Sequence, residues 1–150
     1  ASGAVVFNVI PDRNYTPGVP DQKLSNLLEI VRITEDLGLP LLGGTEMNSP
    51  GQKFVDDFSS AELAPLHSIF LRGSRILHAH STLQKLGGMG YLSEWAVDQF
   101  SDVFQKNSFF EEFGEVFSPR ADQALGGRIG SAQSSVEVLA LARQAMSEFS

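Results

Sequence analysis

The order of short apolar runs and helical patterns constrains this fold more than any other feature of the sequence. Residues 4–10, "AVVFNVI", form a short β-branched run that ends at Pro11, a pattern that predicts a mostly buried strand. Residues 21–37 carry apolar side chains at helical spacing and precede Gly38, which predicts a helix. A second apolar run, residues 39–44, predicts another strand.

Residues 75–80, "RILHAH", fit two structures. As a helix, they would continue the helical pattern of residues 61–71, although Gly73 is expected to end that helix. As a strand, they would be a third short apolar run. The order strand, helix, strand, helix, strand favours the strand, because short connections in that order are typical of a parallel sheet. We therefore expect an α/β fold with a partial (β/α) barrel-like parallel sheet of about three strands, followed by a helical region.

The expected organisation is a single domain in two parts. Residues 1–90 form the βαβαβ half barrel, and residues 91–150 form a helical C-terminal region that packs on it. Within that region, the Gly-rich stretch 118–131 predicts a break between helices. The chain opens without Met, and we expect it to be the C-terminal part of a longer protein. A half barrel would expose strand edges, so a homo-oligomer is one expected way of covering them.

Composition excludes several classes of partner. The 150-residue chain has a formal charge of −7, which disfavours nucleic-acid binding through its overall field. The sequence shows no apolar run near the ~20 residues that a membrane helix needs. It has no Cys, which excludes disulfides and thiolate chemistry. A cytoplasmic location is the default expectation.

Polar residues lie at or just after the C-terminal end of each of the three predicted strands, and parallel strands would bring these ends to one edge of the sheet. Ligands bind at that edge in open α/β sheets and (β/α) barrels. Carboxylates and imidazoles are typical ligands of divalent metals. The predicted metal ligands are Asp12, Glu46, His78 and His80, and the residues predicted to act on substrate are Glu46, Arg13 and Asn48.

Each of these residues also has a structural interpretation. On a strand, His78 and His80 would face the same side, whereas on a helix they diverge by ~200° and cannot share a metal. Glu46 could favour a helix N-terminus through the macrodipole. Asp12 is a common type of turn residue after a proline, and Arg13 could simply pair with it.

The stretches "IPDRNYTP", "GLPLLGGTEMNSPGQKFVDDF" and "HAHSTLQKLGGMGYLSEW" resemble a set of bacterial proteins that we associate with the PHP-type (polymerase and histidinol phosphatase) metal-dependent phosphoesterases. The resemblance implies a distorted (β/α) barrel with divalent metals at its C-terminal face. That family has an early H-x-H and a late D-x-H motif. This chain contains no D-x-H, and the early motif would lie upstream of its first residue.

Three functions follow, one of which is a small-molecule binding domain that uses Arg13 and the glycines to bind an anion without chemistry. The other two come from different classes. The first is the C-terminal part of a metal-dependent hydrolase, in which Zn, Mn or Mg activates water against a small phosphorylated substrate. The second is a non-catalytic interaction or oligomerisation module, which the aromatic-rich segment 100–117 and the amphipathic C-terminal helix indicate. The metal site requires a strand at residues 75–80, so the structure of that segment separates the two.

Overall fold

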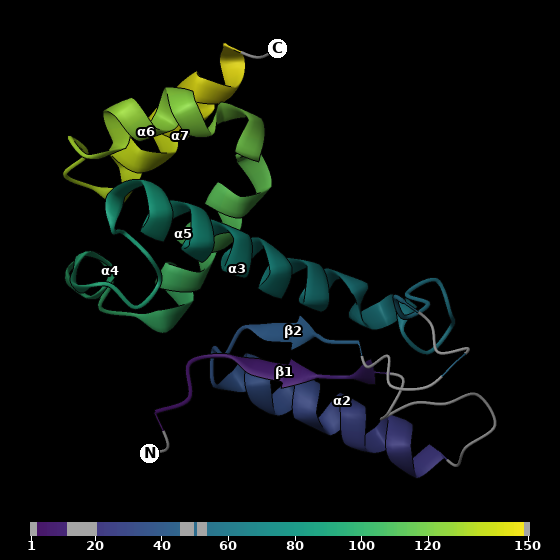
Figure 1. Ribbon diagram of the computed structural model, residues 1–150. Coiled ribbons are helices and arrows are strands. Elements are labelled where there is room, and N and C mark those ends of the chain that lie inside the picture. Colours follow the sequence, from purple (N-terminus) through teal and green to yellow (C-terminus); the bar gives the residue numbers. More distant parts are fainter. Residues whose placement is uncertain (1–2, 12–20, 46–49, 51–53, 149–150) are drawn as a thin grey trace. The chain divides into compact units, whose positions relative to one another are not determined.

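The structure is a computed structural model that describes residues 3–11, 21–45, 50 and 54–148. The described residues are mostly helical, and their only strands form one two-stranded sheet (Figure 1). None of the described helices is long and apolar enough to cross a membrane. The chain divides into two compact units, Ala1–Ser74 and Arg75–Ser150. Our prediction that residues 91–150 pack on residues 1–90 stays a prediction.

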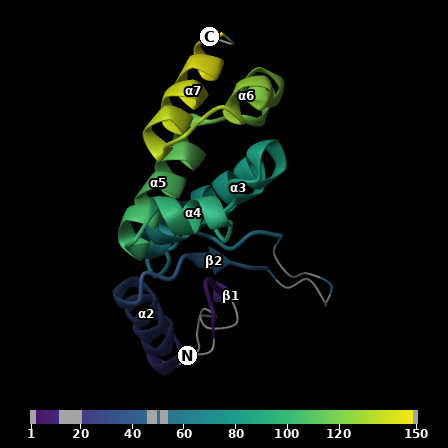
Figure 2. The same ribbon diagram turned by 90° about the vertical axis from the view of Figure 1, so that its left-hand side faces the viewer.

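The first unit contains the βαβ crossover that the apolar runs predict. Strand β1, Phe7–Val9, and strand β2, Leu41–Gly43, pair in parallel, with Phe7 opposite Leu41. Helix α2, Asp21–Asp36, connects the strands and runs beside them (Figures 1 and 2). Parallel strands need such a long connection because the chain must return to the start of the sheet.

Helix α2 ends shortly before Gly38, as predicted. Gly38 has a φ of 63°, a left-handed conformation that strains residues with a Cβ atom. The backbone N–H of Gly38 donates to the carbonyl of Glu35 at 3.0 Å, and that of Leu39 donates to the carbonyl of Thr34 at 2.8 Å. These two bonds satisfy carbonyls that the helix end would otherwise leave unpaired.

The core of the first unit joins the sheet to the residues that follow it. A short 3-10 helix, η1, Ala64–Leu66, leads directly into helix α3, His67–Gly87. A Cβ atom built on Gly73 would lie 1.9 Å from the carbonyl oxygen of Leu41. Helix α3 therefore lies directly against the backbone of β2, an approach that only glycine permits. The buried core residues are Val9, Leu27, Val31, Leu41, Leu63, Leu66 and Phe70.

The predicted third strand is wrong, because residues 75–80 lie inside helix α3. Gly73 does not end this helix; it allows the helix to contact β2. Ile76, Ala79 and Leu83 are buried at helical spacing, so packing on one helix face explains the apolar run better than a strand does. The expected barrel-like sheet of about three strands is therefore wrong too, since the described residues form a sheet of two strands.

The regular elements among the described residues of the second unit are all helices. Three of its helices are α4 (Glu94–Gln99), α5 (Val103–Val116) and α7 (Ser135–Ser147). The side chains of Ser93, Asp102 and Ser134 accept hydrogen bonds from the first turns of these three helices, as N-caps do. Within the aromatic-rich segment 100–117, the phenylalanines buried in the core are Phe109, Phe110, Phe113 and Phe117.

The Gly-rich stretch 118–131 is not a break between helices. Ser118 caps the short 3-10 helix η2, Pro119–Ala121. Helix α6, Asp122–Ile129, follows it and includes two glycines. Burial of Leu125 and Ile129 outweighs the helix-weakening effect of those glycines, about 1 kcal/mol each.

Candidate functional site

The carboxyl ends of β1 and β2 share one edge of the sheet, because the two strands run parallel. The segments that contain Asp12, Arg13, Glu46 and Asn48 follow these ends in the sequence. All four of these residues lie outside the described residues. Their predicted roles, and the metal-dependent hydrolase built on them, therefore stay predictions.

Near the carboxyl ends of the strands lies the side-chain amide of Asn8, which the sequence analysis did not single out. The N–H of Gly44 donates to the carbonyl of Val9 at 2.7 Å, which extends the pairing beyond the strands. A Cβ atom on Gly44 would lie 3.0 Å from the side-chain nitrogen of Asn8. The lack of a side chain at Gly44 thus leaves room for the exposed Asn8 amide.

His78, which belongs to the second unit, bonds to a backbone carbonyl of the same unit. Its Nε2 lies 3.2 Å from the carbonyl oxygen of Phe117. Because a carbonyl oxygen only accepts, Nε2 is the protonated nitrogen in this contact. His78 therefore ties helix α3 to the C-terminal end of α5 at Phe117.

His80 also bonds to the backbone of its own unit. Its Nδ1 accepts a hydrogen bond from the N–H of Tyr91 at 3.0 Å. Since both histidines lie on α3, the premise that they share one face is wrong, because residues two apart on a helix diverge by ~200°. Among the described residues, no group of three His, Cys, Asp or Glu side chains is placed to hold a metal ion.

Tyr91 lies in a buried polar cluster that no sequence motif indicated. Its hydroxyl donates to Oδ1 of Asn107 at 2.6 Å, and the Nζ atom of Lys106 lies 4.2 Å from its ring centroid. Burial raises the pKa of Tyr91 to about 12 and lowers the pKa of Lys106. The cluster joins α5 to the loop before α4 and is structural in character.

The raised pKa of Tyr91 predicts a loss of stability in alkali. The pKa of Tyr91 is about 12 in the folded protein, against an ordinary value of 10.0. Folding therefore favours the neutral phenol, and this contribution to stability is fully present below about pH 10 and is lost as the pH rises through the folded pKa. As the pH rises towards 12, the free energy of unfolding should fall by roughly 2 kcal/mol more in the parent than in Tyr91→Phe. Urea unfolding followed by circular dichroism at several pH values measures this difference. Parallel pH curves for the two proteins would contradict it.

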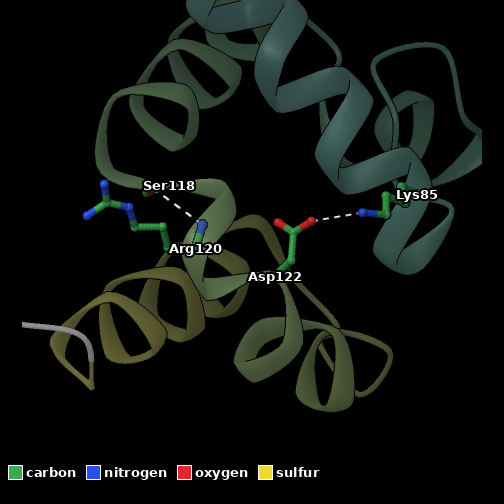
Figure 3. Close-up of polar contacts among 4 residues, drawn as sticks. All are labelled: Lys85, Ser118, Arg120 and Asp122. Carbon is green, nitrogen blue, oxygen red and sulfur yellow. Dashed lines mark hydrogen bonds and ion pairs between the residues drawn. The ribbon is translucent and has the colours of Figure 1, made fainter.

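A second polar cluster lies where α3 meets α6 (Figure 3). Lys85 and Asp122 form an ion pair at 2.9 Å. The other carboxylate oxygen of Asp122 is buried and has no hydrogen-bond partner among the described residues. The guanidinium of Arg120 points away from this carboxylate, so the cluster gathers one acid and one base. That inventory suits a helix contact rather than a catalytic or metal centre.

The outer edge of β1 is the most unusual feature of the first unit. The N–H of Phe7 donates to the carbonyl of Pro40, and the carbonyl of Val9 accepts from the N–H of Gly44. The backbone groups of Phe7 and Val9 therefore point towards β2. The N–H and carbonyl of Asn8 and the carbonyl of Val6 therefore point to the opposite side, because the N–H and the carbonyl of one trans peptide point in opposite directions.

The side chains at the start of β1 are exposed and apolar. Val5, Val6 and Phe7 are 38%, 44% and 40% exposed, values far from those of a covered central strand. The edge of β2 differs, because Gly73 of helix α3 lies against Leu41. Among the described residues of the first unit, β2 thus has a helix packed against it, whereas β1 carries exposed apolar side chains.

Comparison of this chain with protein-family models, curated proteins and solved structures found no match. The resemblance to the PHP-type phosphoesterases accordingly has no support from these comparisons.

Proposed function

We propose that this chain is a non-catalytic protein-association module that accepts an extended polypeptide strand at the outer edge of β1. The observation that supports this function is the combination of outward backbone groups at Val6 and Asn8 with exposed apolar side chains at Val5 to Phe7. Unpaired donors and acceptors along an edge strand are a template for another strand. The adjacent side chains would gain from being covered, at about 25 cal/mol per Å² of apolar surface.

The rest of the first unit favours this edge as the place of binding. The β1–β2 ladder and the core beneath it hold the edge in an extended form before any partner arrives. A preformed edge binds with less loss of conformational entropy than a flexible segment. Backbone hydrogen bonds would supply affinity for any extended chain, and contacts with Val6 and Phe7 would supply preference for apolar side chains.

A short extended peptide tests this function directly. We expect a fluorescein-labelled, end-capped octapeptide of alternating Thr and Val to raise its anisotropy when titrated with the protein. The same peptide with alternate amides N-methylated cannot form one row of backbone bonds, and we expect it to bind at least ~10-fold more weakly.

Matched variants locate the binding to β1. Val6→Lys places a charge on the edge and should weaken peptide binding at least ~10-fold, because strand edges that carry lysine resist pairing. Val136→Lys is the control, since Val136 is an equally apolar side chain that is 75% exposed in the second unit. Equal binding by the parent and Val6→Lys, or no binding by the parent, would reject the proposed function.

A further inference from the structure

We infer that the strand accepted at β1 is the β1 strand of a second copy of this chain, paired antiparallel about a two-fold axis at Asn8. This inference rests on the proposed function and adds the identity of the partner. It follows from the charge, the hydrogen-bonding pattern and the symmetry of the segment Gly3–Ile10.

The charge of the edge permits contact between identical copies. The chain carries a net charge of −7, yet residues 3–10, "GAVVFNVI", include no charged side chain and no proline. Natural edge strands that avoid self-pairing usually carry a lysine, a proline or a bulge. Two copies can therefore approach at this segment without like charges facing each other across the seam.

The hydrogen-bonding pattern of the edge is complementary to itself. The outward N–H and C=O of Asn8 can bond to the C=O and N–H of Asn8 in the second copy, because directly opposite residues of an antiparallel pair exchange both bonds. In the same register Val6 faces Ile10 of the second copy. The Ile10 N–H shares a peptide with the Val9 carbonyl that is bonded to Gly44, so it points away from β2 and can donate to the Val6 carbonyl of the other copy. A single surface thus pairs with its own copy, which is the requirement of a closed dimer.

The side chains on the edge support this register. Val5, Val6 and Phe7 are exposed on the single chain, and an antiparallel partner would lay its own β-branched and aromatic side chains beside them. Such cross-strand pairs add roughly 0.2–1 kcal/mol each. The seam is short, so we expect a weak dimer, with a Kd on the order of 10 µM.

Sedimentation velocity over protein concentrations of about 1–300 µM tests the dimer. We expect reversible monomer–dimer exchange in the parent and in Val136→Lys. In Val6→Lys, each copy would bring an ammonium group to the seam, and the dimer should weaken at least ~10-fold. A parent that stays monomeric throughout this range, or a dimer that Val6→Lys does not weaken, would overturn the inference.

Cysteine cross-linking tests the two-fold register. The chain has no Cys, so Asn8→Cys introduces a single thiol. Opposite Cα atoms in a hydrogen-bonded antiparallel pair are ~5.5 Å apart, within the range that a disulfide spans. We expect oxidation to convert Asn8→Cys largely to a covalent dimer and to leave the exposed control Val136→Cys mostly monomeric. Equal cross-linking of both variants would reject the register.

The two proposals can fail separately. If the Thr-Val octapeptide binds at β1 while the chain stays monomeric, the association function stands and the second-copy inference is wrong. If the chain is monomeric and also binds no peptide, both are wrong. If the parent dimerises and Val6→Lys weakens the dimer, peptide binding is measured at protein concentrations well below the Kd of the dimer. That measurement decides whether the edge also accepts other strands.

Discussion

Replacing Phe110 with Ala is expected to lower the free energy of unfolding of the second unit by about 3–5 kcal/mol. Phe110 is fully buried, at 0% exposure, and its ring centroid lies 5.1 Å from those of both Tyr91 and Phe109. The truncation removes the transfer free energy of a phenyl ring and leaves a cavity that α3, α4 and α5 cannot fully close.

Urea unfolding followed by the fluorescence of Trp95 measures this effect. Trp95 is the single tryptophan of the chain, and its ring lies 5.7 Å from that of Phe109, so it reports on the same core. Phe104→Ala is the matched control on helix α5, because Phe104 is 53% exposed. We expect the control to cost less than about 1 kcal/mol. Similar losses in both variants would show that Phe110 does not organise this core.

Replacing Gly73 with Ala is expected to destabilise the first unit by about 2–3 kcal/mol. Two effects oppose each other. Alanine favours the helical conformation of α3 by about 1 kcal/mol relative to glycine. The added methyl group, however, would lie 1.9 Å from the carbonyl oxygen of Leu41. Neither backbone can yield as a flexible side chain would, so the helix must move away from β2 and the clash outweighs the gain.

Hydrogen exchange at the sheet measures this change in the first unit, which contains no tryptophan. The amides of Phe7 and Gly44 donate across the β1–β2 pair, and we expect their protection to fall about 30-fold or more in Gly73→Ala. Gly127→Ala is the control for propensity alone, because an added Cβ on Gly127 meets nothing within 4 Å. That control should raise stability by about 0.5–1 kcal/mol. Unchanged protection in Gly73→Ala would contradict the close contact.

The sequence predicted the βαβ crossover of the first unit because its signals are local. Strands β1 and β2 lie within the two predicted apolar runs, and helix α2 begins at Asp21 and ends before Gly38. A left-handed glycine at a helix end and the 3.6-residue period depend on residues close in sequence. The same holds for the cap at Ser134, whose side chain accepts from the N–H of Glu137 in the first turn of the C-terminal helix.

The third apolar run could not be assigned from the sequence alone. A short apolar stretch fits a buried strand and a buried helix equally well, and element order then decided wrongly for the strand. Gly73 also led to a wrong prediction, because the sequence does not distinguish a glycine that permits close helix packing from one that ends a helix. The predicted roles of His78 and His80 depended on that assignment. On α3, His78 contacts the carbonyl of Phe117 and His80 accepts from the N–H of Tyr91, and the two side chains do not face a shared metal ion.

Local signals along the chain account for the crossover, the two ends of α2 and the uncharged character of residues 3–10, because each depends on neighbouring residues. Which edge of the sheet remains exposed among the described residues depends instead on tertiary packing. That edge is β1, because Gly73 brings α3 onto the backbone of β2 while Val5, Val6 and Phe7 remain exposed. The physical reason is that an edge strand is defined by what packs beside it, and the residue that covers β2 lies about thirty positions further along the chain.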